Sequence, residues 1–166
     1  MLIDGRGGGR PPKAVLVDAG ADRFGATMDI GGWRFECKLS ARDTCGELCI
    51  YDTVRSIKGG PPLHTHWQQD EWFYVRHGEF LFQVGSERFH LKAGDTLLGP
   101  RGVPHAFAAL TNASALLIAF QPAGAIEEVV AEVWGLSQSR TVGLEDWRKI
   151  AGPRAIEIVA PPLQIS

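Results

Sequence analysis

Short apolar segments separated by turn residues fill the middle of this chain, and they limit its fold more than any other feature. Between Gly25 and Gln121, alternating or continuous apolar runs are broken by turns rich in Gly and Pro. Residues 33–39 (WRFECKL) alternate apolar and polar side chains, as a strand with one buried face does. The other strand-like runs are ELCIYDTVRSI, EWFYV, EFLFQV, ERFHL, DTLLG, HAFAAL and ALLIAF. Many short strands with closely spaced turns predict a β-sandwich or small β-barrel rather than alternating strands and helices.

Two connections between these strands are specified by residue type. Gly85 and Ser86 stand between EFLFQV and ERFHL, which predicts a hairpin whose two-residue turn uses the positive φ that glycine allows. Residues 59–62 (GGPP) predict a stiff corner that leads into His64, because proline fixes its own φ.

The last part of the chain has a helical pattern instead. Residues 125–136 have apolar positions at helical spacing, and Gly135 is expected to end this helix. The residues expected on its apolar face are Ile126, Val129, Val130 and Val133. Residues 143–152 predict a second short helix, and residues 155–163 return to extended chain. Both helices are expected to pack on the outer surface of the barrel.

These patterns divide the chain into three segments with no internal repeat and no second domain. Residues 1–24 are expected to hold a flexible N-terminal segment and a first strand, with flexibility centred on GRGGGRPP at 5–12. Residues 25–122 form the predicted barrel. Residues 123–166 carry the C-terminal helices and an extended tail packed on that barrel.

Composition excludes several classes of function. A chain of 166 residues with 45% hydrophobic side chains suits one globular domain, and a net charge of -2 without a Lys/Arg cluster argues against nucleic acid or anionic membrane as a partner. Neither a signal-peptide pattern nor a membrane-length apolar run is present, so a cytoplasmic location is expected. Cys37, Cys45 and Cys49 are odd in number and lack CxxC spacing, so buried, small apolar roles are favoured.

Two histidines and a carboxylate share one face of the predicted strands. His64 and His66 are two residues apart, so their side chains project to the same side of a strand. In the next strand, Glu71 shares its face with Phe73 and Val75. If the strands at 62–66 and 71–76 are neighbours, Glu71 joins the two imidazoles.

A third histidine follows a tight turn later in the chain. In GDTLLGPRGVPHAF (94–107), Gly and Pro residues precede His105, which shares its predicted inward face with Phe107 and Ala109. A lone HxH pair is weak evidence, because histidines near loops are commonly solvated. Three imidazoles and one carboxylate that converge predict a site for one divalent transition metal: Fe, Mn, Co, Ni, Cu or Zn. Four protein ligands on an octahedral ion leave two positions for water, dioxygen or substrate.

The other polar residues of this region are not expected to bind the metal directly. Asp70 points away from the histidines by parity, and His77 and His90 are expected on the surface. Gln68, in the loop between the candidate ligands, is expected either to hydrogen-bond one of them or to be an exposed amide.

Aromatic residues near the candidate site are open to two interpretations. Phe73 and Phe107 share the predicted inward faces, so they either line a pocket or simply fill the core. Trp33, Trp67 and Trp72 are candidates for a pocket rim or a dimer interface.

These motifs resemble those of the cupins. Residues 59–78 read G-x4-H-x-H-x4-E-x6-G, one residue shorter at the front than the usual first cupin motif. Residues 94–105 read G-x5-P-x-G-x2-H, the core of the second motif, although Ala109 replaces its terminal Asn. The segments GPPLHTH, DEWFYV, GPRGVPHAF, FQPAG and IEIVAPPL are similar to those of single-domain, quercetin 2,3-dioxygenase-like cupins. The resemblance covers roughly residues 25–166.

The resemblance implies an all-β fold, an antiparallel jelly-roll barrel with one or two C-terminal helices, commonly paired as a homodimer. It implies metal ligation by His64, His66, Glu71 and His105. The expected function is that of a mononuclear metal-dependent, dioxygenase-like oxidoreductase acting on a small aromatic or oxygenated substrate, with Glu71 as a catalytic base. The alternatives are a non-catalytic cupin that binds or senses a small molecule, and a non-redox isomerase.

Overall fold

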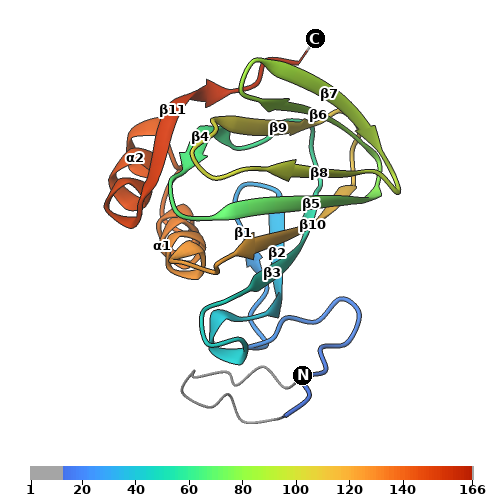
Figure 1. Ribbon diagram of the computed structural model, residues 1–166, viewed down its shortest axis with the longest axis vertical. Coiled ribbons are helices and arrows are strands. Elements are labelled where there is room, and N and C mark those ends of the chain that lie inside the picture. The colour runs from blue at the N-terminus through green and yellow to red at the C-terminus, as the bar shows by residue number, and fades with distance from the viewer. Residues whose placement is uncertain (1–12, 166) are drawn as a thin grey trace, which may run out of the picture.

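Two antiparallel sheets face each other in the computed structural model, which describes residues 13–165 (Figure 1). The six-stranded sheet contains, in spatial order, β1 (Met28–Asp29), β2 (Trp33–Leu39), β3 (Cys49–Arg55), β10 (Ser114–Gln121), β5 (Asp70–His77) and β8 (Thr96–Gly99). The five-stranded sheet contains β11 (Ile156–Pro162), β4 (Pro62–His66), β9 (His105–Ala109), β6 (Glu79–Val84) and β7 (Glu87–Lys92). The predicted all-β jelly roll is confirmed.

The strand predictions agree closely with the structure inside the barrel. Residues 33–39 form β2 over the whole predicted length, and β6 and β7 form the hairpin around Gly85. The first strand was expected within residues 1–24, but residues 13–24 form only turns and irregular chain, and β1 begins at Met28. The segment GRGGGRPP lies outside the described residues.

The strands at 62–66 and 71–76 are not neighbours, so the condition under which Glu71 was to join the two imidazoles is not met. β4 belongs to the five-stranded sheet and β5 to the six-stranded one, because residues 67–69 carry the chain across from one sheet to the other. The partner of β4 is instead β9, in a register that places His64 opposite His105. Glu71 therefore approaches the histidines from the facing sheet.

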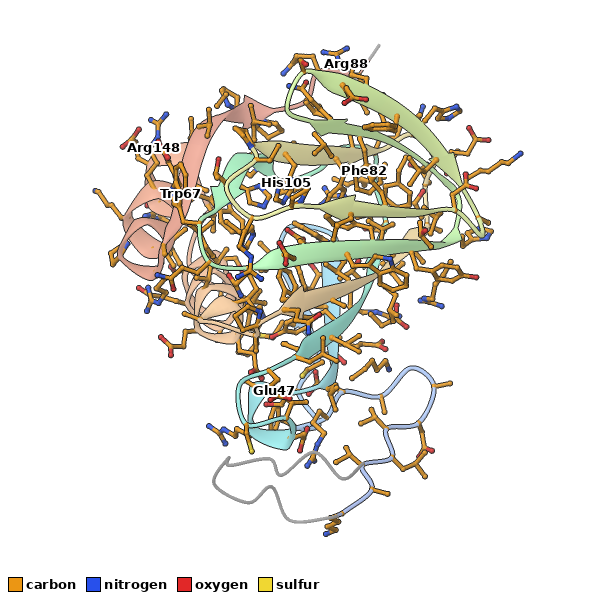
Figure 2. The ribbon with its side chains drawn as sticks, in the orientation of Figure 1. Glu47, Trp67, Phe82, Arg88, His105 and Arg148 are labelled. Atoms are coloured by element: carbon orange, nitrogen blue, oxygen red, sulfur yellow. The ribbon has the colours of Figure 1, made fainter. Side chains whose placement is uncertain are left out.

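Aromatic side chains from both sheets fill the space between them. Phe73 packs 4.8 Å from Phe82 and 5.6 Å from Phe107, measured between ring centroids. Figure 2 shows Phe82 and His105 inside the molecule and Arg88 at its surface. Each fully buried Phe contributes about 1.5–3 kcal/mol of hydrophobic free energy, so these rings hold the two sheets together.

Both predicted helices are present, but their position differs from the expectation. α1 (Ile126–Ser137) buries the four predicted apolar residues, and α2 (Leu144–Ala151) packs on β11. Gly135 lies inside α1 rather than at its end. Instead of covering an outer surface, the helices contribute walls to the cavity between the sheets, on one side of the molecule (Figure 1). Among the described residues, neither helix is long and apolar enough to cross a membrane.

Two short 3-10 helices complete the structure. Ala41–Asp43 follows β2, and the backbone N–H of Ala41 donates to the Glu127 carboxylate of α1 at 2.9 Å. Gly152–Arg154 follows α2 and turns the chain into β11. The C-terminal segment is thus tied to both sheets.

Candidate metal centre

Four buried side chains from three strands meet between the sheets. His64 and His66 come from β4, His105 from β9 and Glu71 from β5, and their candidate ligand atoms lie within 4.8 Å of one another. The carboxylate oxygen Oε2 of Glu71 lies 2.8 Å from His105 Nε2, 3.3 Å from His66 Nε2 and 3.7 Å from His64 Nε2. The structure therefore brings together all four residues that the sequence singles out as metal ligands.

Each imidazole is oriented by a hydrogen bond on its outer nitrogen. His64 Nδ1 donates to the carbonyl oxygen of Pro62 at 2.7 Å, and His105 Nδ1 donates to that of Val103 at 2.9 Å. His66 Nδ1 donates to Gln69 Oε1 at 2.9 Å. Because these acceptors carry no proton, they favour a proton on each Nδ1 and leave the Nε2 lone pairs for an ion near Glu71.

The protonation of the cluster follows from burial and from mutual contact. Burial lowers the pKa of His66 to about 4, although the charge of Glu71 opposes this shift. Burial on its own raises the pKa of Glu71, but its hydrogen bond with His105 and its contacts with His64 and His66 outweigh burial and hold that pKa below its usual range. Burial lowers the pKa of His105, and the hydrogen bond that its Nε2–H donates to Glu71 more than reverses this, so the net shift is upward. An ionised carboxylate and neutral imidazoles are the forms that bind metal ions.

The donor set fits one divalent transition metal. Imidazole nitrogen suits Fe, Ni, Cu, Co and Zn, and one carboxylate oxygen adds affinity for harder ions such as Mn. A buried carboxylate facing three imidazoles in a site held by outer hydrogen bonds is preorganised for such an ion. These residues are therefore the ones that would hold the metal.

Gln69, not Gln68, orients a candidate ligand. Gln69 is 3% exposed, and its amide nitrogen donates to the carbonyl of Ala123, which leaves Oε1 to accept from His66. Gln68 is exposed, so of its two predicted roles only the exposed amide remains. The partner that orients Gln69 follows β10, far away in sequence, and no local pattern could have shown it.

Replacing Gln69 with Leu is expected to weaken metal binding by about 10- to 100-fold, the usual effect of removing a hydrogen-bond partner of a ligand histidine. The reason is that His66 loses the acceptor that orients its ring. Titration of the metal-free protein with Zn²⁺ or Co²⁺ measures the dissociation constant. The neighbouring Gln68→Leu is the matched control and is expected to bind as the wild type does. Equal affinities in the two variants would contradict this role of Gln69.

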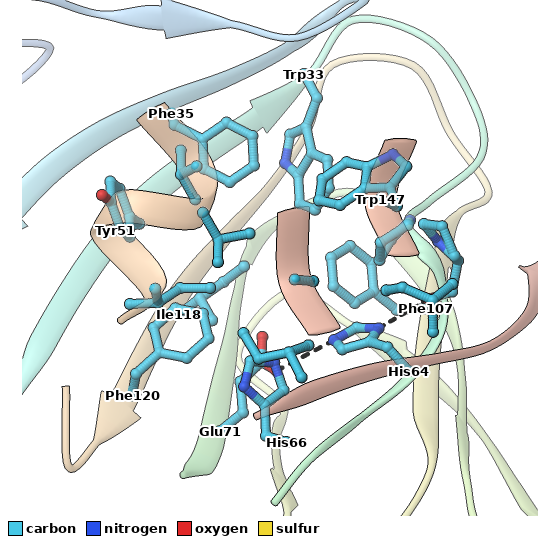
Figure 3. A pocket seen from close by; sticks show the side chains of 18 residues that line it. Trp33, Phe35, Tyr51, His64, His66, Glu71, Phe107, Ile118, Phe120 and Trp147 are labelled. Atoms are coloured by element: carbon cyan, nitrogen blue, oxygen red, sulfur yellow. Dashed lines mark hydrogen bonds and ion pairs between the residues drawn. The ribbon is translucent and has the colours of Figure 1, made fainter. Parts of the chain in front are cut away.

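A small, mainly apolar cavity of about 60 Å³ opens onto the cluster (Figure 3). His64, His66 and Glu71 lie at one end of its lining, and Trp33 and Trp147 lie at the other (Figure 3). Its remaining side walls come from both sheets, both helices and the corner before β4: Phe35, Tyr51, Pro61, Pro62, Phe107, Ile118, Phe120, Ile126, Val129, Val130, Ala151, Ile156 and Ile158. A substrate in this cavity would contact mostly apolar surface, with its polar interactions concentrated at the four-residue cluster.

The two candidate pocket phenylalanines have different positions. Phe107 lines the cavity, as one of its two predicted roles requires. Phe73 does not belong to the lining; it is fully buried and packs at 6.2 Å from the ring of His105, which is the core role.

The remaining candidates lie away from the cluster. Asp70 faces outward and forms an ion pair with Arg101 at 2.7 Å, which holds the pKa of Asp70 near 2 through hydrogen bonds from the Arg101 side chain and backbone. His77 is exposed, and His90 is exposed beside Glu79 at 2.9 Å.

The three tryptophans and the three cysteines divide between interior and surface. Trp33 is buried in the cavity wall, whereas Trp67 and Trp72 are exposed. Cys37 and Cys49 are buried, as expected, but Cys45 is exposed.

A family model described as a cupin domain matches residues 56–120, the span that contains all four side chains of the cluster. Among curated proteins, an uncharacterised protein of Methanocaldococcus jannaschii is 37% identical over 43 residues, 26% of this chain. The match spans only 34% of the length of that relative.

Several solved structures share the fold. An RmlC-like cupin from Shewanella frigidimarina is 26% identical with a TM-score of 0.51, over 58% of this chain and 83% of its own. KdgF from a Halomonas species is 23% identical with a TM-score of 0.50, over 58% of this chain and 86% of its own. TT1209 from Thermus thermophilus is 19% identical with a TM-score of 0.53, over 66% of this chain and 98% of its own. A cupin-domain model thus matches residues 56–120, and the described chain shares its jelly-roll fold with the RmlC-like cupin.

Proposed function

We propose that this chain is a mononuclear metal-dependent enzyme, a dioxygenase-like oxidoreductase, that acts on a small aromatic or oxygenated substrate. The observation that supports it best is the convergence of three imidazole Nε2 atoms and the Glu71 carboxylate beside a mainly apolar cavity, which His64, His66 and Glu71 line at one end. A purely structural core would fill such a place with apolar side chains, because buried polar groups are costly to desolvate.

His64, His66, Glu71 and His105 would hold the metal ion. When bound, a divalent transition metal polarises a substrate oxygen and, if it is redox-active, supplies a site for dioxygen. The three outer hydrogen bonds hold the imidazole rings in their orientations. Because Glu71 comes from one sheet and the histidines from the other, the ligand geometry also depends on both sheets being packed together.

The rest of the cavity determines what can enter. Phe107, Ile118 and Phe120 present apolar surface that excludes water and suits an aromatic ring. Glu71 is the one carboxylate in the lining, and it lies 2.8 Å from His105 Nε2. With one carboxylate oxygen on the metal, the other would accept a proton from a bound substrate, which is the role of a general base.

Elemental analysis of protein purified from metal-replete medium is the decisive test, and about one transition metal ion per chain is expected from a single four-ligand site. Oxygen consumption is then measured with a panel of flavonols and catechols, and turnover of at least one is expected from the loaded protein only. Purified protein without bound transition metal would contradict the proposal as a whole. Metal without oxygen uptake would contradict the oxidoreductase part alone.

A non-redox proton transfer is the second candidate, favoured by the hydrogen-bonded pair of Glu71 and His105 in the enclosed site. Such an isomerase would exchange a substrate C–H with solvent without consuming oxygen. Deuterium incorporation from D2O into candidate sugars and organic acids, followed by NMR, separates the two reactions. A sensing cupin would bind its ligand without either change.

A homodimer belongs to the same proposal. Trp72 and Tyr74 on β5 stack on the outer face of the six-stranded sheet, and Leu98 of the paired strand β8 is exposed beside Trp72. Apolar side chains grouped on a sheet surface are typical of protein interfaces. Light scattering is expected to give the mass of two chains for the wild type and of one chain for Trp72→Ser.

A further inference from the structure

Arg55 is a charged residue at the end of β3, with its side chain on the inward face of the sheet. Alternate residues of this strand, Cys49, Tyr51, Thr53 and Arg55, are buried, so the arginine shares the inward face of the sheet with core residues. It is 8% exposed. A guanidinium at such a position normally has an anionic partner, because burial of an unpaired charge is strongly unfavourable.

The structure gives Arg55 no such partner. Within residues 13–165, no carboxylate or carbonyl makes a hydrogen bond or an ion pair with Arg55, and its Nε–H is buried with no acceptor. The guanidinium stacks over the ring of Trp33 at 5.0 Å. Burial lowers the pKa of Arg55 to about 10, with some opposition from the charge of Asp29, so the group stays charged at neutral pH.

Trp33 offers a second unused donor beside the first. Its Nε1–H is also buried without an acceptor, and the side chain is 7% exposed. Two neighbouring buried N–H donors that lack acceptors are unusual, since most buried polar groups are hydrogen-bonded. Both residues also line one groove, so an anion bound there would lie beside the unpaired guanidinium.

Arg55 and Trp33 line a groove of about 450 Å³ that adjoins the metal cavity. Its other walls are the Gly60–Pro62 corner, the link between α1 and α2, and the end of β11. Trp33, Pro61, Pro62 and Trp147 line both spaces. In Figure 3, Trp33 and Trp147 lie at the end of the cavity opposite Glu71 and His66, so the groove begins where the cavity ends.

We propose that this groove binds the oxyanion of an organic acid, a carboxylate or phosphate, at the guanidinium of Arg55, with Trp33 forming the adjoining wall. The identity of the substrate rests on the proposed function. If the metal centre is an enzyme site, its substrate is an elongated organic acid held by its anionic end at Arg55. Glu71 pairs with Phe120, which pairs with Cys49, six positions before Arg55 on β3. Six strand residues correspond to roughly 20 Å between the backbone positions of Glu71 and Arg55, and the two side chains shorten this gap. A single-ring acid is too short to span the gap, so it would occupy the anion site alone.

Binding of simple acids to the metal-free protein tests the anion site directly. Phenylacetate and phenyl phosphate are the probes, phenylacetamide is the neutral comparison, and tryptophan fluorescence with ligand-observed NMR gives the dissociation constants. The acids are expected to bind at least about tenfold more tightly than the amide, since hydrogen bonds to charged groups are the stronger ones. The better of the two acids identifies the oxyanion as carboxylate or phosphate.

Variants then assign the binding to Arg55. Arg55→Gln is expected to lose about tenfold or more in acid affinity, Arg55→Lys to retain part of it, and Trp33→Phe to lose a smaller factor. Arg88→Gln, which removes an exposed arginine of β7, is the matched control and is expected to change nothing. Arg55→Gln also removes an unpaired buried charge, so it should unfold at no lower temperature than the wild type.

The outcomes separate this proposal from that of the metal enzyme. Equal binding of acid by the wild type and Arg55→Gln, or no preference of the wild type for acid over amide, would overturn the anion site. Because the protein is metal-free in these titrations, acid binding stands even if no metal centre is found. Conversely, a protein that binds metal but not acid would be consistent with the proposed function and would contradict the anion site.

Discussion

His105→Ala is expected to purify without the transition metal that the wild type carries. The substitution removes one of four donors and also the nitrogen that lies 2.8 Å from Glu71 Oε2. Loss of an outer hydrogen-bond partner lowers metal affinity by roughly 10- to 100-fold. Because His105→Ala removes a ligand itself, its metal affinity should fall by more than that. Elemental analysis of the two proteins, prepared side by side, gives the result.

A second readout does not depend on purification history. At about 100 times its dissociation constant, a metal ion stabilises the folded state by about 2.7 kcal/mol, so Zn²⁺ should raise the unfolding temperature of the metal-free wild type but not of His105→Ala. His77→Ala, which removes an exposed histidine of β5, should respond as the wild type does. A full thermal shift in His105→Ala would mean that the ion binds elsewhere.

Gly60→Ala is expected to lower the free energy of unfolding by about 3 kcal/mol or more, which is large for the addition of one methyl group. A Cβ at this position would lie 1.6 Å from the carbonyl oxygen of Phe107 and 3.1 Å from the Cα of Ala108. Both atoms belong to the backbone of β9, so the clash can be relieved only if the 59–62 corner moves away from this strand, which also carries His105. Urea unfolding followed by circular dichroism measures the loss.

Gly135→Ala is the matched control for this prediction. Gly135 lies within α1, and no heavy atom lies within 4 Å of a Cβ added there. Alanine favours a helix more than glycine does, so this variant should be more stable by about 0.5–1 kcal/mol. If Gly60→Ala were as stable as the wild type, the close packing of the 59–62 corner on β9 would be wrong.

Local patterns were sufficient for most of the strands. Alternation between buried and exposed positions identified β2 over its full length, and helical spacing identified the buried face of α1. The same period of two placed His64 and His66 on one side of β4 and Glu71 on the inward side of β5. These features depend only on residues near one another in the chain, so the sequence contains them.

Strand pairing and helix packing could not be predicted from local patterns, because they depend on residues far apart in the chain. β4 and β5 are consecutive, yet they belong to opposite sheets, and the choice depends on which strands pair best with β9 and β10. The helices were expected on an outer surface, but their apolar faces contribute to the cavity instead. Amphipathic spacing shows that one face must be buried and says nothing about the surface that buries it.

By itself, the sequence determined which residues form strands and helices, which way their side chains point, and that three histidines and one glutamate are candidates for a single centre. Only the tertiary structure decided that Glu71 reaches the histidines from the facing sheet, that Gln69 orients His66, and that Arg55 faces a groove with no anionic partner among residues 13–165. The difference is one of distance along the chain. Side-chain direction follows from local backbone geometry, whereas each of these contacts joins segments whose approach depends on the packing of the whole fold.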